Sequence, residues 1–290
     1  MKRLFCFGLG YSATALAARL AAEGWHVGAT TTSQAGTDRI AALGYEPFVF
    51  DGVSADWKIT RALTVATHVL VSVPPGPDGD PVLAHICAAL TESRSVRWVG
   101  YLSTIGVYGD WQGAWVDEES ALRPKSERSL RRAAAEQAWL DLGMATGKTV
   151  LLFRLAGIYG PGRSAIDNIL DGSARRLIKP GQVFNRVHRD DIAGVLQAAM
   201  SQRPRHTIYN VTDDEPAPPQ DVVAYAAALL GRPVPPEIAY DQATLSPMGA
   251  SFYGENKRAS NARAKGDLGW RLQYPNYRDG LAAIAAGMKT

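Results

Sequence analysis

Cysteine is scarce in this chain, and long apolar runs are absent. The two cysteines, Cys6 and Cys87, lie in apolar segments, where a free thiol behaves as a small hydrophobic side chain. Two distant cysteines do not make a disulfide framework, and no cysteine or histidine spacing matches a zinc site. No apolar run reaches the length of a membrane span. We therefore expect no metal, no membrane partner and a reducing, cytoplasmic location.

An excess of one charge is also lacking, because 31 basic residues face 28 acidic ones and the net charge is only +3. The densest basic group, Arg128, Arg131 and Arg132, falls in one helical segment rather than along a patch. We therefore expect no nucleic-acid partner. The 46% of hydrophobic residues and a length of 290 residues are typical of a globular chain with one large domain or two modest ones.

The basic N-terminus and the apolar stretch after it resemble a secretory signal peptide. Gly8 and Gly10 interrupt the hydrophobic part, however, and Arg19 lies inside it. Residues 4–7 have the composition of a strand, and residues 12–22 are rich in good helix formers. A strand, a glycine turn and a helix describe this segment better than a signal peptide does.

The first two-thirds of the chain alternates strand-like and helical segments, the pattern of a doubly wound α/β Rossmann fold with a parallel sheet. We expect strands at residues 3–7, 26–30, 46–50, 68–72, 97–103 and 149–155, and helices around 14–23, 39–43, 82–91 and 129–142. Glycine and proline become denser after Gly160, and one strand (207–211) and one helix (221–230) follow. We expect a nucleotide-binding domain at 1–160 and a smaller C-terminal substrate lobe at 161–290, interleaved with the last sheet strands.

A glycine-rich turn between the first strand and the first helix has the form G-x-G-x-x-A. Gly8 permits a tight turn, Gly10 lets the backbone approach a pyrophosphate, and Ala13 allows close packing of helix on strand. Free N–H groups at the helix start, at residues such as Tyr11 and Ser12, attract phosphates. This context favours a nicotinamide dinucleotide over an ordinary glycine turn.

The end of the second strand carries hydroxyl groups where NAD-binding proteins carry an acid. Thr31, Thr32 and Ser33 stand there, the first carboxylate is Asp38, and Arg39 follows it. Because an acid would repel a 2′-phosphate and hydroxyl groups accept it, we expect NADP in preference to NAD. The alternative is that these residues simply form a turn.

Two later strand ends should also meet the cofactor. Asp51 follows the third strand and is suited to bind the adenine amino group, and Val73 and Pro74 follow the fourth, where the chain turns across the cofactor. Ordinary strand ends would look similar at each position taken alone. Their shared placement at the carboxyl ends of strands favours the cofactor-binding interpretation.

Four ordered motifs resemble the extended short-chain dehydrogenases and reductases, the superfamily of the NAD(P)-dependent epimerases and dehydratases. They are YLSTIGVYG at 101–109, RLAGIYGPG at 154–162, VHRDDIA at 187–193 and YNV at 209–211. The likeness spans nearly the whole chain. It implies that Thr104 is the catalytic hydroxyl, which polarises a substrate carbonyl or hydroxyl beside the nicotinamide.

The tyrosine of the family's Y-x-x-x-K motif is missing. Counting back from Glu136 puts Arg128 at the tyrosine position and Arg132 at the lysine position. A phenol can exchange a proton with substrate, whereas a guanidinium stays charged. Arg132 can still hold the cofactor ribose, and two fixed charges suit an anionic substrate or a developing oxyanion. The pattern resembles the atypical branch of the superfamily, as does the segment 256–263.

Further residues of these motifs are candidates for the substrate cleft: Tyr108, Tyr159, Arg163, Asn168 and His188. Tyr108 is usually structural in the family, although it could replace the missing base. His188 lies beside two aspartates and could titrate near neutral pH, although a structural histidine joining the two lobes is the favoured interpretation.

Two functions remain open. The first is an NAD(P)-dependent oxidoreductase or epimerase/dehydratase-like enzyme for a small substrate that is anionic or resembles a nucleotide sugar. The second is a non-catalytic NAD(P)-binding sensor or regulatory protein, favoured by the missing tyrosine. By analogy with the extended family, the helices at 82–91 and 129–142 could form a homodimer.

Overall fold

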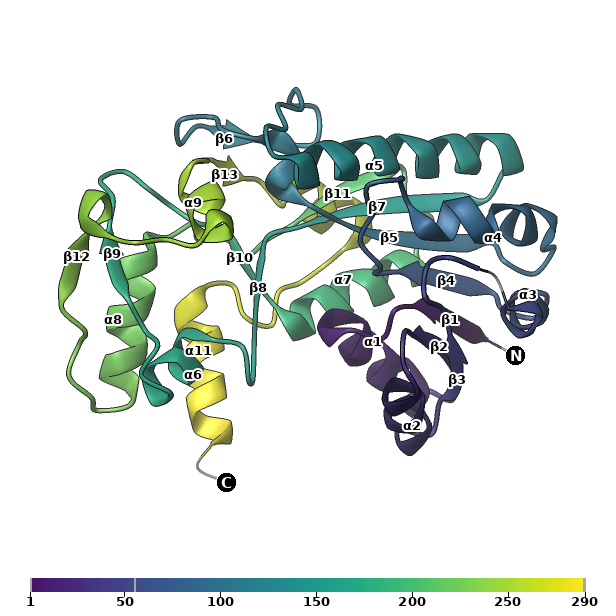
Figure 1. The fold of residues 1–290 in the computed structure, drawn as a ribbon, viewed down its shortest axis with the longest axis horizontal. Coiled ribbons are helices and arrows are strands. Elements are labelled where there is room, and N and C mark those ends of the chain that lie inside the picture. Colours follow the sequence, from purple (N-terminus) through teal and green to yellow (C-terminus); the bar gives the residue numbers. More distant parts are fainter. Residues whose placement is uncertain (1, 55, 289–290) are drawn as a thin grey trace.

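A seven-stranded parallel sheet forms the centre of the computed structural model, which describes residues 2–54 and 56–288 (Figure 1). Its strands are β1 (Arg3–Phe7), β2 (His26–Thr31), β3 (Glu46–Val49), β4 (His68–Val71), β5 (Trp98–Thr104), β7 (Thr149–Leu155) and β11 (Ile208–Val211). Their order is β11-β7-β5-β4-β1-β2-β3, and every neighbouring pair is parallel. The order reverses between β1 and β4, which is where doubly wound sheets bind ligands. The expected Rossmann fold is confirmed.

Helices cover both faces of this sheet. One face carries α1 (Tyr11–Ala22), α2 (Gln34–Ala42) and α7 (Arg189–Ser201), and the other carries α3 (Trp57–Leu63), α4 (Pro81–Glu92) and α5 (Glu127–Thr146). The expected helices exist, but α1 and α2 begin three and five residues earlier than expected. Gly10 and Ser33 mark those starts. Each face buries its own apolar cluster, so the strands read as nearly continuous apolar runs.

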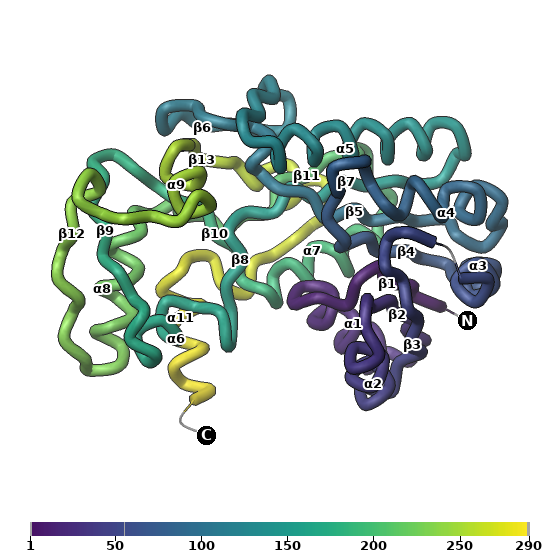
Figure 2. Tube along the Cα trace, viewed as in Figure 1, coloured from purple at the N-terminus to yellow at the C-terminus, as the bar shows by residue number. Residues whose placement is uncertain are grey.

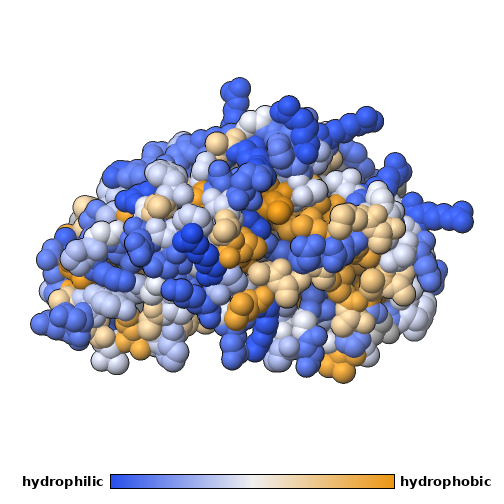
Figure 3. All heavy atoms as spheres, turned by 90° about the horizontal axis from the view of Figure 1, so that it is seen from above, coloured by the Kyte–Doolittle hydropathy of each residue, from blue (hydrophilic) through white to orange (hydrophobic). Residues whose placement is uncertain are grey.

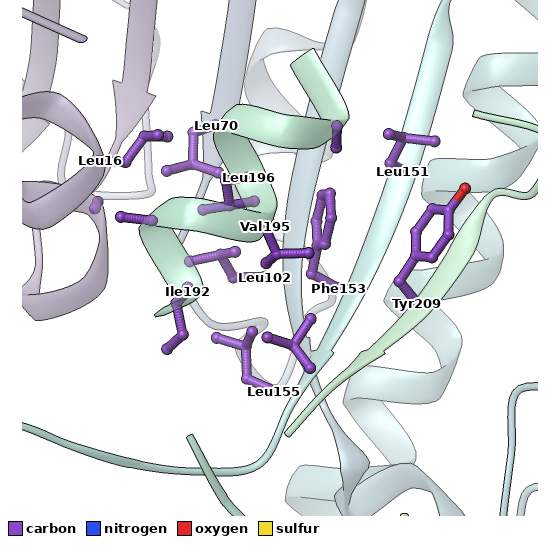
Figure 4. Packing of buried hydrophobic residues seen from close by; sticks show 14 of the residues in the cluster. Leu16, Leu70, Leu102, Leu151, Phe153, Leu155, Ile192, Val195, Leu196 and Tyr209 are labelled. Atoms are coloured by element: carbon purple, nitrogen blue, oxygen red, sulfur yellow. The ribbon is translucent and has the colours of Figure 1, made fainter. Parts of the chain in front are cut away.

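Helix α7 was not among the expected helices, although it completes the core on the α1 face. Ile192, Val195 and Leu196 recur at helical spacing and are fully buried against strands β5 and β7 (Figure 4). The charged start of α7, with Asp190 and Asp191 in its first turn, hid this periodicity in the sequence. Its N-terminus places Arg189 beside the start of α1, a contact that matters for the site.

The smaller lobe lies to the left in Figure 1, and Figure 2 follows its chain. It contains three parallel two-stranded pairs: β8 (Gly157–Tyr159) with β10 (Arg186–His188), β9 (Arg176–Ile178) with β12 (Glu237–Ala239), and β6 (Trp115–Val116) with β13 (Arg258–Ala259). Its helices are α6 (Ala165–Leu170), α8 (Pro219–Leu229), α9 (Pro247–Tyr253) and α11 (Tyr277–Gly287), and it contains the 3-10 turn η2 (Tyr240–Gln242). Helix α10 (Ala262–Leu268) and the 3-10 turn η1 (Ile105–Tyr108) pack in the apolar cluster of the sheet instead. A separate apolar cluster holds α6, α8 and α11 together.

The C-terminal segment around Asn256 ties this lobe to the sheet. The backbone oxygen of Asn256 accepts hydrogen bonds from the amides of Trp111 and Gly113. The buried ammonium of Lys257 donates to the carbonyl oxygen of Gly109 at 2.6 Å. These contacts anchor the end of η1, the turn that begins at the candidate catalytic hydroxyl.

The described residues contain neither a helix that could span a membrane nor a cluster of side chains that could hold a metal ion. No helix among residues 2–54 and 56–288 has the length and apolar character that crossing a membrane would need. No group of three histidine, cysteine or acidic side chains in the same residues is placed to hold a metal ion.

Candidate functional site

The glycine turn after β1 is built by hydrogen bonds from neighbouring strand ends. Gly8 has a φ of +82°, its amide donates to the Thr30 hydroxyl at 2.8 Å, and its carbonyl accepts from the Ser72 hydroxyl at 2.6 Å. A Cβ at Gly8 would lie 3.0 Å from the Ser72 oxygen. Only glycine therefore fits this position, both for its backbone conformation and for its space.

The start of α1 is open. Gly10 is the N-cap, no side chain caps the helix, and a Cβ at Gly10 would meet no atom within 4 Å. The first amides of a helix have no partner within the helix, and its dipole is positive at this end. The amides of Tyr11, Ser12 and Ala13 can therefore receive a pyrophosphate, and the residues present fit a dinucleotide.

The hydroxyl groups after β2 are partly engaged within the protein. Thr31 packs so closely against Gly36 of α2 that a Cβ at Gly36 would collide with the Thr31 hydroxyl. Ser33 caps α2, because its hydroxyl oxygen accepts a hydrogen bond from the Gly36 amide. Thr32 is exposed. Arg39 reaches from α2 to the glycine turn and donates to the carbonyl oxygen of Leu9 at 3.2 Å. A cation therefore lies beside the turn, and no acid stands at this strand end.

The other two predicted cofactor contacts lie at the ends of β3 and β4. Asp51 is exposed, and one of its oxygens accepts from the amides of Val53 and Ser54, which holds the pKa of the carboxyl below its usual value. Val73 lines the glycine turn, with its side chain 3.2 Å from where a Cβ of Gly8 would lie, and Pro74 is exposed.

The candidate catalytic hydroxyl stands at the carboxyl end of β5. Thr104 caps η1, and its oxygen accepts from the Gly106 amide at 3.1 Å. Both Thr104 and the buried Ser129 of α5 lie within 3.4 Å of the place where a Cβ of Gly106 would stand. Gly106 therefore lets α5 approach the turn closely. The Thr104 proton remains free to be donated to a ligand.

The two arginines that replace the family's tyrosine and lysine differ in position. Arg132 is half-buried and donates to the carbonyl oxygen of Leu102 at 2.5 Å, close to the end of β5. Arg128 is exposed, and its guanidinium lies 5.2 Å from the ring centroid of Phe252 in α9. Arg132 therefore stays at the end of β5, bound two residues before Thr104, whereas Arg128 reaches from α5 to α9 of the smaller lobe.

A buried polar network supports this strand end, and sequence reasoning did not find it. Glu136 accepts from the Ser103 hydroxyl at 2.5 Å and pairs with Arg154 at 2.7 Å. Arg154 also donates to the Tyr108 hydroxyl, which donates to the side-chain oxygen of Asn210. Tyr108 is fully buried and its hydroxyl is engaged. We therefore leave Tyr108 out of the proposed substrate site and correct its expected role to a structural one.

Two more predicted substrate contacts lie inside the smaller lobe. Tyr159 is buried and its hydroxyl donates to the Asn276 carbonyl at 3.4 Å. His188 is 2% exposed and caps α7 by accepting the Asp190 amide at its Nδ1. Its ring packs against Tyr159 and Tyr274, and burial lowers the pKa of His188 to about 4. A titration of His188 near neutral pH, considered from the sequence, does not fit this environment.

The remaining candidates are exposed at the start of α6. Asn168 lies on the helix surface, and Arg163 stacks near the ring of Tyr11, whose hydroxyl donates to the Pro161 carbonyl at 2.9 Å. The structure thus brings Tyr11 and Arg163 together across the two lobes. It places Thr104 and Arg132 together near the carboxyl end of β5.

Comparison with known proteins gives relatives along the whole chain. No family model matches it. Protein YeeZ of Escherichia coli K12 is 27% identical over 299 residues, which cover 95% of this chain and 97% of YeeZ. A solved, conserved protein of unknown function from Silicibacter pomeroyi is 46% identical, with a TM-score of 0.90 over 100% of both chains.

Two further solved structures carry a description of activity. A candidate NAD-dependent epimerase/dehydratase from Methylobacillus flagellatus is 25% identical, with a TM-score of 0.71 over 100% of this chain and 99% of that one. UDP-glucuronic acid 4-epimerase from Bacillus cereus, solved with NAD, shares the fold at 18% identity, with a TM-score of 0.76 over 100% of this chain and 97% of that one. The chain therefore belongs to the same family as the Silicibacter pomeroyi protein, and its structural neighbours include a candidate NAD-dependent epimerase/dehydratase, in agreement with the superfamily that its motifs predicted.

Proposed function

We propose that this chain is an NAD(P)-dependent oxidoreductase or epimerase/dehydratase-like enzyme for a small anionic substrate. One observation carries the proposal. The uncapped start of α1, with open space before Gly10, lies on the same carboxyl edge of the sheet as the free hydroxyl of Thr104. The likeness to NAD-dependent epimerases and dehydratases supports it.

In this proposal the cofactor's pyrophosphate meets the amides of Tyr11, Ser12 and Ala13, and the chain after β4, at Val73 and Pro74, lies against it. When bound, the nicotinamide gives or accepts a hydride. The protein's part is to hold the ring beside the end of β5 and to orient the substrate there.

Thr104 and Arg132 act on the substrate. The Thr104 oxygen already accepts the Gly106 amide, and its own O–H can donate a hydrogen bond to a substrate carbonyl oxygen. Arg132 has nitrogens beyond the one bound to Leu102, and these can hold a ribose or a developing oxyanion. A guanidinium does not give up its proton, so the proton that neutralises the substrate oxygen comes from water, and the hydroxide left behind is released to solvent. We expect turnover to be about 10²–10⁴ slower than with a phenol acid.

An anionic substrate follows from the unpaired arginines. Among the described residues, no carboxylate oxygen lies within 4 Å of a nitrogen of Arg128, Arg132 or Arg163. A carboxylate or phosphate on the substrate would supply the missing partner. Asn168, exposed on α6, is the neutral candidate for orienting the substrate.

NADP is the proposed cofactor, in preference to NAD. Arg39 holds its guanidinium at the glycine turn, next to a strand end without an acid. We expect Arg39→Ala to weaken NADPH about tenfold and NADH little, because only NADPH has a 2′-phosphate. Calorimetry with both nucleotides measures the ratio, and equal losses would contradict the preference.

The function itself is tested by turnover. The purified protein is incubated with NADPH or NADH and a panel of sugar nucleotides, small keto acids and aldehydes, while nucleotide fluorescence reports binding and oxidation. We expect oxidation with at least one anionic carbonyl compound, and its loss in Thr104→Val. Tight nucleotide binding without any hydride transfer would contradict an enzyme.

A non-catalytic sensor is the second candidate, and the placement of tyrosines favours it. Arg128 occupies the position of the acid, and the hydroxyls of Tyr108 and Tyr159 are engaged with other protein groups. The double variant Arg128→Tyr with Arg132→Lys restores the family's pair. Activity gained only in this variant supports the sensor, whereas activity in the native chain excludes it.

A homodimer and a cytoplasmic location stay proposals. Helices α4 and α5 are the candidates for the dimer interface. The view from above shows apolar patches on a mostly polar face (Figure 3), and α5 exposes Leu130 and Met144. Light scattering of the native chain and of Leu130→Glu would decide between a dimer and a monomer.

A further inference from the structure

We infer that two arginines beside the start of α1, Arg163 of the smaller lobe and Arg189 at the start of α7, clamp the cofactor's pyrophosphate together with the amides of α1. The inference rests on the proposed dinucleotide site and adds a second half to it. It also adds a cofactor contact to the hydrogen bond between Tyr11 and Pro161 that joins the two lobes.

The first observation is the position of the two guanidinium groups. Arg189 lies 4.8 Å and Arg163 lies 5.8 Å from the ring centroid of Tyr11, the first residue of α1. Arg163 follows β8, and Arg189 is the first residue of α7, so both come from chain far from the glycine turn. Tyr11 joins the lobes by donating to the Pro161 carbonyl at 2.9 Å.

The second observation is that little negative charge compensates this cluster. Among the described residues, no carboxylate oxygen lies within 4 Å of Arg163, and Arg189 has only a 3.5 Å contact from its Nε to Asp190. The terminal nitrogens of both arginines are free of carboxylates. The positive end of the uncapped α1 adds to the same field. This place is therefore suited to an anion, and two phosphates of one ligand would pair with both guanidinium groups.

The third observation is a buried polar atom at the same junction. His188 is 2% exposed, and its Nε2 has no hydrogen-bond partner among residues 2–54 and 56–288. This Nε2, the Tyr11 oxygen and the Cβ of Arg189 all surround Gly160. A Cβ built on Gly160 would lie 3.4 Å, 2.5 Å and 3.3 Å from them, respectively. Because Nδ1 accepts the Asp190 amide, Nε2 carries the proton in the neutral ring. It is an unused donor aimed at the point where Tyr11 and Arg189 meet.

Calorimetry of nucleotide binding tests the clamp. We expect Arg163→Gln and Arg189→Gln each to weaken NADPH and ADP-ribose about tenfold, and the double variant about a hundredfold. Adenosine, measured by competition, has no phosphate and should bind the native chain and the double variant equally. His188→Phe should show a smaller loss for NADPH, since it removes one neutral donor.

A matched control removes one positive charge elsewhere. Arg94 is exposed after α4, at the opposite edge of the sheet, and Arg94→Gln should bind NADPH as the native chain does.

Hydrogen exchange gives a second readout. NADPH should slow exchange across residues 160–164 in the native chain and in Arg94→Gln, but not in the double variant.

The possible outcomes distinguish a failure of the arginine clamp from a failure of the proposed cofactor site. If the native chain binds NADPH and the double variant binds it equally well, the clamp is wrong and the proposed cofactor site stands. If the double variant loses affinity for adenosine as much as for ADP-ribose, the arginines act on the fold and the clamp is wrong. If the native chain binds no dinucleotide, both the proposed function and the clamp fail.

Discussion

The guanidinium of Arg132 on α5 donates a 2.5 Å hydrogen bond to the carbonyl oxygen of Leu102 on β5. This contact fixes the arginine beside the strand end that carries Thr104. It also uses only part of the guanidinium, which leaves other N–H groups for a ligand.

Replacing Arg132 by methionine should weaken the nicotinamide half of the cofactor. We expect NADPH to bind about tenfold more weakly to Arg132→Met, because a charge-assisted hydrogen bond to the nicotinamide ribose is lost. The fragment 2′,5′-ADP lacks that ribose and should bind unchanged. Arg132→Lys should recover part of the loss. Equal weakening of NADPH and the fragment would contradict this role.

Alanine substitutions at the two glycines of the turn should affect different properties, the free energy of unfolding at Gly8 and dinucleotide affinity at Gly10. Gly10→Ala places a methyl group in empty space, so the free energy of unfolding should stay within about 1 kcal/mol. The same methyl group stands where the pyrophosphate is proposed to bind, so dinucleotide affinity should fall at least about tenfold.

Gly8→Ala is the contrasting variant. It forces an alanine to a φ of +82° and places its Cβ 3.0 Å from the Ser72 oxygen, so the folded state should lose about 1–2 kcal/mol. Urea unfolding and calorimetry on both variants measure the two effects. Unchanged dinucleotide binding by Gly10→Ala would contradict the proposed site.

The ion pair of Glu136 and Arg154 should dominate the stability of the sheet's carboxyl edge. Both side chains are at most 4% exposed, so Glu136→Gln leaves a buried guanidinium without its counter-charge and should cost about 3–5 kcal/mol in urea unfolding. The matched control is Glu127→Gln on the same helix. Its partner Arg131 is 36% exposed and Glu127 is 83% exposed, so we expect a loss below about 1 kcal/mol. Similar losses in both variants would refute this assignment.

Acid should destabilise the protein through two histidines, the buried His188 and the half-buried His68. Burial lowers the pKa of His68 and of His188 from 6.5 to about 4. Between these values the unfolded chain binds protons that the folded chain does not. Folding stability is therefore fully present above pH 6.5 and falls as the pH drops toward 4.

The ring of His68 lies between Trp25 and Trp98, so phenylalanine can take its place. The free energy of unfolding of His68→Phe should fall less steeply than that of the native chain between pH 6.5 and 4. Denaturant titrations at several pH values measure the two slopes. Identical slopes would show that His68 does not contribute.

Much of the fold followed from local patterns. The strand, turn and helix from Arg3 to Ala22 are contiguous, so their residue types predict them directly, although Thr30 and Ser72 from later strands hold the Gly8 turn in place. Strands β1 and β7 occur with the expected bounds for the same reason, because an apolar run buried on both faces reads directly as a strand. Helix α7 escaped because its apolar stripe follows a charged first turn.

By itself, then, the amino-acid sequence determined the Rossmann sheet, the glycine turn and the absence of a tyrosine at the position of Arg128. Only the tertiary structure decided which side chains meet. Tyr11 bonds Pro161 across 150 residues, and Lys257 bonds Gly109 across 148. Such contacts depend on how separate elements pack, and no periodicity along the chain encodes the partner of a side chain so far away.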